Sequence, residues 1–292
     1  MLAQLEPWSF QIEPGFRMRG WRTEFTGKPL IYFLHGNGFC GLTYLPMLKA
    51  LIDDFDLIIS DLPGHGDSDV GRKFAPWNGS AKCALDVLHY FSQQLPEGTK
   101  VYGLGHSYGG VITGLMAGRD PSCFDKCLLL DPVIFSKNML NLMKAADFVG
   151  LLDNTKLAKS ARNRNQHWPN RVTAYKALRG KGGFKNWSDE SLHAYVSYAL
   201  TESRDGVSLK CPAKIEAKIF SSYPNRLWSY LKKVSMPCKI LMAKKSFPFI
   251  RDSVGKLSHH PAYSIDTIEG GHCFMQEQPQ VAAEQIKAWL LA

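Results

Sequence analysis

The chain has 292 residues, of which 45% are hydrophobic and 21% charged, and it carries a formal net charge of +9. No apolar run approaches the roughly 20 residues that span a bilayer, and no secretory signal is recognisable, so we expect neither a membrane-spanning nor a secreted protein. The seven cysteines follow no repeating spacing, which favours reduced thiols in a cytoplasmic protein over disulfides or a zinc site.

The first third of the chain alternates between strand and helix patterns. Strands are predicted at residues 8–13, 17–25, 29–34 and 56–60, and helices at 44–55 and 77–95. Strands that alternate with helices are typical of a parallel sheet covered on both faces.

A candidate nucleophile follows the next short strand, residues 100–102. The sequence from Gly105 to Gly109 fits G-x-S-x-G, and a helix is predicted from Tyr108 to about residue 117. In such a turn Ser107 takes up strained backbone angles, and its hydroxyl stands at the top of the sheet. A side chain at Gly105 or Gly109 would collide with the neighbouring strand or helix.

A strand at 127–130 ends in Asp131, and the sheet pattern is then interrupted by about a hundred residues. This insertion shows no strand alternation. Helices are predicted in it at 137–148, 169–178, 188–201 and 216–231. We therefore predict a helical cap at 134–233 on a core of 1–133 and 234–292. The core resumes with strands at 239–243 and 262–268 and an amphipathic helix at 279–291.

The positive charge is concentrated in this insertion. Residues 134–235 contain 18 Lys and Arg against 7 Asp and Glu. A solvated helical surface explains most such patterns, while an acidic substrate or a weak contact with an anionic membrane surface stays open. No nucleic-acid-binding signature accompanies the charge, so a nucleic-acid partner is not expected. The sequence does not indicate an oligomeric state.

Two further glycine-containing loops follow predicted strands. The stretch from His35 to Phe39 exposes backbone amides, and those of Asn37 (or Gly38) and Tyr108 are candidates for an oxyanion hole. His35 is interpreted as bonding loop backbone. The loop at residues 61–68, with Asp61 and His65, is interpreted as a tight loop without a catalytic role.

Gly270-Gly271-His272 follows the last predicted strand and precedes a helix. A histidine at such a strand end is placed to reach an exposed serine. As general base, His272 would take the proton of Ser107 and later return it to the leaving group.

Taken in order, HGNGF, DLPGHGDS, GHSYG, LLLDP and GGH resemble the motifs of the α/β-hydrolase superfamily. The resemblance implies an eight-stranded, mostly parallel sheet with its first strands antiparallel, helices on both faces and an inserted helical cap. It also implies a Ser–acid–His triad. Within the cap, WPNRVTAYKAL, LHAYVSYAL and DGVSLKCPAKIEAKIF resemble hydrolases that include peroxisomal lipases and fungal toxin-biosynthesis proteins.

The triad acid is the point where the sequence departs from this family. Ser246 stands where most members carry an aspartate, and serine cannot bear the charge. Asp131, at the end of the strand after the nucleophile helix, is the preferred candidate. Asp252, on a predicted helix, and the absence of any acid are the alternatives.

These features predict a serine hydrolase that cleaves a small-molecule carboxylic ester with an apolar or lipid-like part. Ser107 attacks, His272 transfers the proton, Asp131 orients His272, and the amides of Asn37 and Tyr108 hold the oxyanion. No metal or organic cofactor is required by this chemistry. Thioesters, lactones and C–C bonds stay open as substrates, and the alternative function is a ligand-binding receptor on a hydrolase fold.

Overall fold

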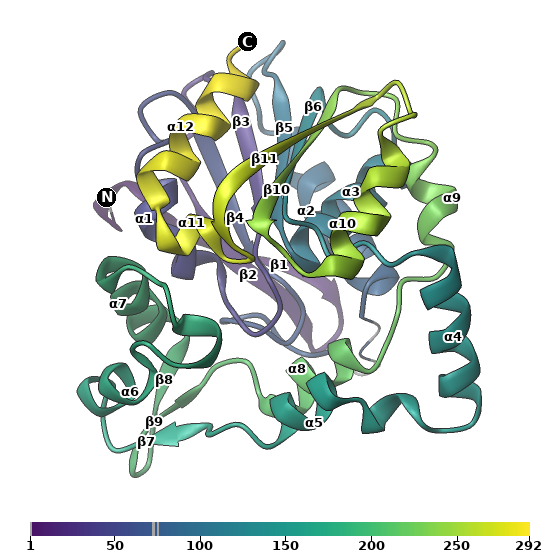
Figure 1. Cartoon of the computed structure of the whole chain (residues 1–292). Helices are drawn as coiled ribbons and strands as arrows, with labels where there is room; N and C mark the ends of the chain where they lie inside the picture. Colours follow the sequence, from purple (N-terminus) through teal and green to yellow (C-terminus); the bar gives the residue numbers. More distant parts are fainter. Residues whose placement is uncertain (1, 72–73, 75) are drawn as a thin grey trace.

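The computed structural model describes residues 2–71, 74 and 76–292, and a large sheet forms its centre (Figure 1). Its strands lie in the order β1-β2-β4-β3-β5-β6-β10-β11. Their bounds are β1 (Glu6–Glu13), β2 (Phe16–Arg22), β3 (Leu30–Leu34), β4 (Asp56–Asp61), β5 (Val101–His106), β6 (Lys126–Leu130), β10 (Cys238–Lys245) and β11 (Tyr263–Gly271). Strand β2 pairs antiparallel with β1 and β4, and the other pairs are parallel. The predicted mostly parallel sheet of eight strands is confirmed.

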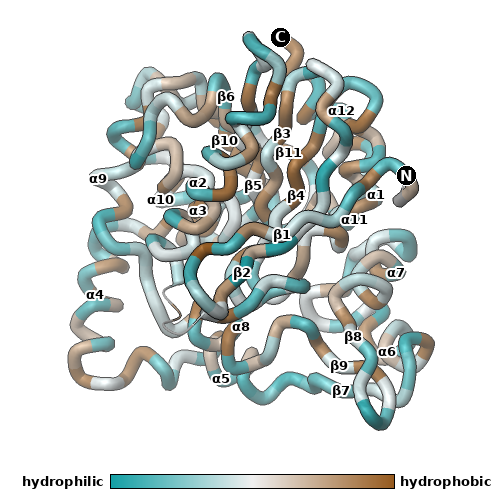
Figure 2. The backbone as a smooth tube through the Cα atoms, turned by 180° about the vertical axis from the view of Figure 1, so that it is seen from behind, coloured by the Kyte–Doolittle hydropathy of each residue, from teal (hydrophilic) through white to brown (hydrophobic). Residues whose placement is uncertain are grey.

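Both faces of this sheet are buried, which is why the central strand β3, with the sequence LIYFL, is apolar at every position rather than at alternate ones. In β3, Leu30, Tyr32 and Leu34 point into one core, and Ile31 and Phe33 point into the other. The first core is closed by α2 (Asn78–Ser92), α3 (Tyr108–Arg119), α9 (Leu227–Leu231) and α10 (Pro248–Val254). The second is closed by α1 (Leu45–Leu48), α11 (Phe274–Glu277) and α12 (Pro279–Leu290). Figure 2 shows the hydrophobic strands running through the middle of the molecule.

The inserted segment lies across the carboxyl edge of the sheet (Figure 1). Its elements are α4 (Lys137–Phe148), η3 (Leu152–Asn154), α5 (Lys156–Arg162), β7 (His167–Trp168), α6 (Arg171–Leu178), η4 (Gly182–Phe184), α7 (Asp189–Tyr198), β8 (Leu200–Ser203), β9 (Gly206–Leu209) and α8 (Ala213–Phe220). The remaining short helices of the chain are η1 (Leu2–Gln4), η2 (Gly41–Tyr44) and η5 (Gly255–Leu257). The boundaries 134–233 for a separate cap stay a prediction.

The insertion is not entirely helical, although only helices were predicted in it. Strands β7, β9 and β8 form a small antiparallel sheet in that order. Each has only two to four residues, which is too short for an alternating pattern to be recognised. Trp168, Val207 and Leu209 of this sheet pack with Tyr195 of α7 in a hydrophobic cluster of their own.

Two predicted helices are shorter or divided in the structure. The pattern at 44–55 corresponds to η2 and the single turn of α1, and turns follow Leu48. The pattern at 216–231 is divided into α8 and α9 around Pro224, because proline lacks the amide hydrogen that a continuous helix needs. No helix among the described residues is both long and apolar enough to cross a lipid bilayer.

The topology decides where the loops of interest meet. Strands β3, β5, β6, β10 and β11 run parallel, so their carboxyl ends reach the same edge of the sheet. In open sheets of this type the crevice outside the carboxyl ends of the strands is the usual place for ligands.

Candidate active site

Ser107 occupies the sharp turn between β5 and α3, with φ of 55° and ψ of −113°. Its amide donates a hydrogen bond of 3.0 Å to the Leu130 carbonyl, and its carbonyl accepts from the Val111 and Val133 amides at 3.1 and 3.3 Å. Left-handed φ values in residues other than glycine are strained, and this bonding holds the strain in place. The turn has the strained backbone geometry that the motif predicts for a nucleophile elbow.

The two glycines of the motif allow close packing around the elbow. A Cβ atom at Gly105 would lie 2.4 Å from the Gly109 carbonyl oxygen, and one at Gly109 would lie 2.3 Å from that of Leu34. Both distances are far below van der Waals contact, so the predicted collisions are confirmed. The first turn of α3 consequently lies directly against the loop that follows β3.

His272 reaches Ser107 from the end of β11. Its Nε2 lies 2.8 Å from Ser107 Oγ. At the end of β11, Gly270 has a φ of 121°, and the Gly271 amide donates to the Glu277 carboxylate at 3.1 Å. The carboxylate at the end of α11 therefore fixes the loop that carries the imidazole.

Asp131 completes a hydrogen-bonded chain of three side chains. Its Oδ2 lies 2.6 Å from His272 Nδ1, and the carboxylate is fully buried. Oδ1 accepts a hydrogen bond of 3.0 Å from the Ala243 amide, and Oδ2 accepts one of 2.7 Å from the Ser246 hydroxyl. The Ser246 hydroxyl thus supports the Asp131 carboxylate. Asp252 is exposed on α10, and His272 bonds no carboxylate other than Asp131 within the described part of the chain.

The two amides predicted for an oxyanion hole lie in adjoining loops. Asn37 follows β3 and Tyr108 begins α3. Among the residues that the structure describes, neither backbone amide donates to another protein group. The Asn37 side chain donates to the Glu216 carbonyl at 3.2 Å, which ties the loop to α8. Both amides are available to a bound oxygen atom.

The neighbouring polar groups shape loops, as the sequence predicted. His35 accepts from the Leu62 amide at 2.9 Å, and its other ring nitrogen lies 2.8 Å from the Gly36 carbonyl. Asp61 accepts from the Gly41 and Asp67 amides at 2.7 and 2.9 Å. These bonds join the loops after β3 and β4.

Sequence reasoning missed a second chain of hydrogen bonds behind the histidine. The Gly36 amide donates to the Tyr44 hydroxyl at 3.0 Å, and that hydroxyl lies 2.6 Å from His106 Nδ1. His106 Nε2 lies 2.9 Å from the His272 carbonyl oxygen, which can only accept. The proton of His106 is therefore on Nε2, and Tyr44 donates to Nδ1. Burial lowers the pKa of His106 well below its usual range, so the ring stays neutral.

Tyr44→Phe is expected to reduce turnover by about tenfold, or roughly 1.4 kcal/mol, which is within the range that one hydrogen bond contributes. The substitution removes the donor to His106 and the acceptor for Gly36, while the aromatic ring is kept. The measurement is kcat and KM on a soluble ester beside the thermal midpoint. A loss of stability without a change in kcat would show that the chain is only structural.

Stability is expected to fall as the pH drops from about 6.5 towards about 4, because burial lowers the pKa of His65 from 6.5 to about 4. In this window the unfolded chain binds a proton at His65 that the folded chain does not bind. This difference lowers the free energy of unfolding by about 3 kcal/mol for His65 alone. His35 and His106 have pKa values lowered in the same direction. Asp61 opposes them, since burial raises its pKa to about 6 and the folded state gains a proton below that pH.

Urea unfolding at a series of pH values measures this dependence. His65→Gln should make the free energy of unfolding less dependent on pH between about 4 and 6.5, whatever it does to stability at neutral pH. An unchanged dependence in this variant would contradict the assignment of the effect to His65.

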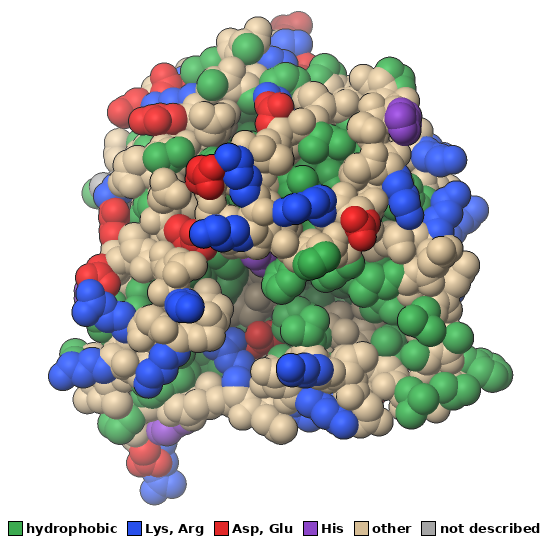
Figure 3. Space-filling view, viewed as in Figure 1, with side chains coloured by type: hydrophobic (Ala, Val, Ile, Leu, Met, Phe, Trp, Pro, Cys, Tyr) green, Lys and Arg blue, Asp and Glu red, His purple; other side chains and the backbone are tan. Residues whose placement is uncertain are grey.

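Phenylalanine side chains lead away from the histidine. The Phe247 ring lies 5.1 Å from that of His272 and is 47% exposed. The ring centres of Phe249 and Phe247 are 6.0 Å apart. The Phe135 ring stacks on that of Phe249, with 5.9 Å between the ring centres. Figure 3 shows the molecule hollowed between the sheet and the inserted helices, with hydrophobic side chains on the right of the hollow. This side of the site offers an apolar surface.

A charged pair lies on another side of the site, against the loop that follows β3. Arg164 Nη1 pairs with Glu216 Oε2 at 2.7 Å, and Arg164 Nη2 donates to the Tyr195 hydroxyl at 3.1 Å. A Cβ atom at Gly38 would lie 2.9 Å from the Glu216 carboxylate carbon. The inserted segment is thus anchored against the loop that carries the Asn37 amide.

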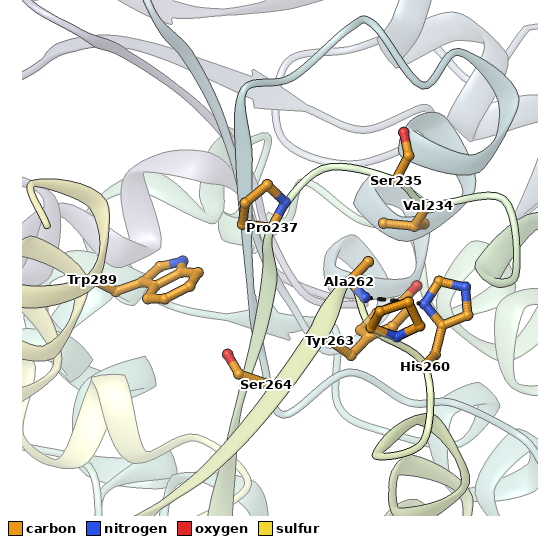
Figure 4. Close-up of a pocket in the computed structure, with 9 residues that line it drawn as sticks. Val234, Ser235, Pro237, His260, Ala262, Tyr263, Ser264 and Trp289 are labelled. Carbon is orange, nitrogen blue, oxygen red and sulfur yellow. Dashed lines mark hydrogen bonds between the residues drawn. The ribbon is translucent and has the colours of Figure 1, made fainter.

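A separate cavity of about 490 Å³ lies at the opposite end of the sheet (Figure 4). It is lined by Pro237 and Ala262, which directly precede β10 and β11, and by His260 and Trp289. Ser107, Asp131 and His272 lie at the other, carboxyl edge of the sheet, so this cavity is not part of the candidate site. Within the described residues, no three His, Cys, Asp or Glu side chains are grouped as metal ligands would be.

The sequence matches the model of the alpha/beta hydrolase family over residues 31–285. A monoglyceride lipase of Rattus norvegicus is 33% identical over 122 residues, which are 40% of this chain. The chain spans only 39% of the length of that lipase.

Solved structures match over nearly the whole chain. An E-2-(acetamidomethylene)succinate hydrolase has a TM-score of 0.78 at 16% identity, with 98% of this chain and 100% of that chain covered. A peroxisomal alpha-beta-hydrolase from Saccharomyces cerevisiae has a TM-score of 0.75 at 17% identity, with 98% and 87% covered. At these identities the likeness shows a shared fold.

Proposed function

The chain belongs to the alpha/beta hydrolase family, and from this membership and the site geometry we propose that it is a serine hydrolase that cleaves a carboxylic ester. The observation that carries the proposal is the chain Ser107–His272–Asp131, with bonds of 2.8 and 2.6 Å. A nucleophile bonded to a base, which is in turn oriented by a third group, is the arrangement that activates a serine hydroxyl.

The steps follow from the positions of these groups. Ser107 Oγ attacks the ester carbonyl while its proton passes to His272 Nε2. The negative oxygen that forms is held by the free amides of Asn37 and Tyr108. His272 then protonates the leaving alcohol, and a water molecule, activated by the same histidine, releases the acid from the acyl-enzyme. Asp131 keeps the proton of His272 on Nδ1 and stabilises the imidazolium.

An apolar substrate is supported by the aromatic side of the site. The exposed Phe247 ring beside His272 offers an apolar contact to the acyl or alcohol part that lies next to the attacked carbon. Each methylene group buried there contributes about 0.8 kcal/mol. We therefore propose that esters with longer chains are preferred.

The test combines labelling with a substrate series. A fluorophosphonate probe should label the wild-type protein at Ser107 and leave Ser107→Ala unlabelled. On p-nitrophenyl esters, kcat/KM should rise by up to about fourfold per methylene group until the apolar surface is filled. Labelling without turnover on any ester would favour a ligand-binding receptor on the same fold, and a wild type that is not labelled would contradict the proposed nucleophile.

A further inference from the structure

The segment from α4 to α5, residues 137–162, exposes large apolar side chains to solvent. They are Leu142, Phe148, Val149, Leu151 and Leu157, between 56% and 92% exposed. Figure 3 shows hydrophobic side chains gathered over α4 at the lower right. Exposed apolar groups scattered singly are normal, but several on one short segment mark an interaction surface. We call residues 137–162 the α4–α5 surface.

The same segment is basic. It contains Lys137, Lys144, Lys156, Lys159 and Arg162 against Asp147 and Asp153. Both acids have partners, since Asp147 accepts from the Tyr223 hydroxyl at 3.2 Å and Asp153 lies 3.9 Å from Arg162. Among the described residues, none of the four lysines is paired with a carboxylate. The apolar side chains are therefore surrounded by a net positive charge.

The α4–α5 surface is joined to the neighbourhood of His272 by packed aromatic side chains beneath it. Phe135 lies just before α4, packs on Phe249, and through it connects to Phe247 beside His272. Leu140, on the buried side of α4, belongs to the same hydrophobic core as Phe135. The buried core beneath the α4–α5 surface therefore reaches, through Phe249, the exposed Phe247 ring beside His272.

We propose that the α4–α5 surface docks on an anionic lipid membrane. Apolar side chains that protrude among lysines suit a membrane surface, where they enter the acyl boundary while the lysines meet anionic headgroups. Self-association through this surface would bring two net positive charges together, which opposes a dimer. The inference goes beyond the proposed ester hydrolysis and does not depend on it.

The experiment measures co-sedimentation with vesicles. The purified full chain is mixed with vesicles of phosphatidylcholine alone or of equal parts phosphatidylcholine and phosphatidylglycerol. Binding is expected on the anionic vesicles at low salt and should weaken steeply as salt is added, because exposed charges are screened beyond about 10 Å at 0.1 M. Wild-type protein that stays in the supernatant at low salt would overturn the proposal.

Matched variants separate this surface from the rest of the insertion. Phe148→Ser/Leu151→Ser should weaken binding by about tenfold or more, because binding scales with the apolar area inserted. Lys144→Gln/Lys156→Gln should weaken it by about fivefold per lysine at low salt. The control Val172→Ser removes a 63% exposed valine from α6 and should bind like wild type. Equal losses in the control and the test variants would overturn the assignment to this surface.

Two more measurements, of ester hydrolysis and of oligomeric state, distinguish membrane docking from the proposed hydrolase function and from self-association. All these variants should hydrolyse a short, soluble ester as wild type does, since the substituted residues lie outside the triad. A wild type that sediments with vesicles yet cleaves no ester would refute only the proposed function. A dimer in sedimentation velocity that Phe148→Ser/Leu151→Ser abolishes would identify a self-association surface and would overturn membrane docking.

Discussion

Ser107→Ala is expected to reduce ester hydrolysis by about 10⁶-fold, because members of such a triad act as one unit and the nucleophile begins every turnover. His272→Ala should lose a similar amount. The double variant should lose little more, since Oγ and Nε2, 2.8 Å apart, serve the same proton transfer. The measurement is kcat/KM on the preferred p-nitrophenyl ester.

The thermal midpoint of Ser107→Ala is the control for this experiment. The hydroxyl bonds only to His272 among the described side chains, so its removal should leave the fold intact. Turnover that persists in Ser107→Ala, or losses that add up in the double variant, would mean that the two residues do not share one catalytic step.

Asp131→Asn is expected to lower turnover near neutral pH by about 10⁴-fold, because the amide favours the wrong tautomer of the histidine. The side chain keeps its shape and can still accept from the Ala243 amide, so the pocket should change little. Asp252→Asn is the matched control. It substitutes an exposed aspartate on α10 and should have turnover equal to wild type. A large loss in the control alone would exchange the roles of the two acids.

A substitution at Ser246 is expected to restore part of the activity that Asp131→Asn loses. Its hydroxyl lies 2.7 Å from Asp131 Oδ2, so a carboxylate at position 246 would stand close to the histidine. Ser246→Asp is expected to restore part of the turnover lost in Asp131→Asn. In the wild-type background it should be harmful, because two carboxylates this close cannot both ionise. Ser246→Ala should lower the free energy of unfolding by about 2 kcal/mol, because the lost hydrogen bond is made to a charged carboxylate.

The local parts of the site could be predicted because short stretches of sequence encode them. The turn at Ser107 requires close backbone approach at Gly105 and Gly109. This requirement is visible in the sequence as the five-residue motif G-x-S-x-G. His272 was found in the same way, from two glycines after the last strand. For these residues the sequence determines the local backbone, and the parallel strand order brings the two turns to one edge.

The support of the triad could not be predicted, because it depends on contacts across the chain. Asp131 and His272 are 141 residues apart, and the Ser246 hydroxyl reaches Asp131 across 115. The sequence offered Asp131 beside Asp252 without excluding either. Tyr44 and His106 have no motif at all, since the middle positions of G-x-S-x-G accept many residues.

The sequence by itself determined the sheet, the elbow, the histidine turn and the positive charge of the insertion. Those features depend on periodicity, on glycine at close approaches and on residue counts, all of which are local or additive. Only the tertiary structure decided which carboxylate contacts His272, that residues 167–209 include a small sheet, and that the apolar side chains of residues 137–162 face solvent. A helical pattern gives the spacing of apolar residues, but whether that face is covered depends on what packs against it.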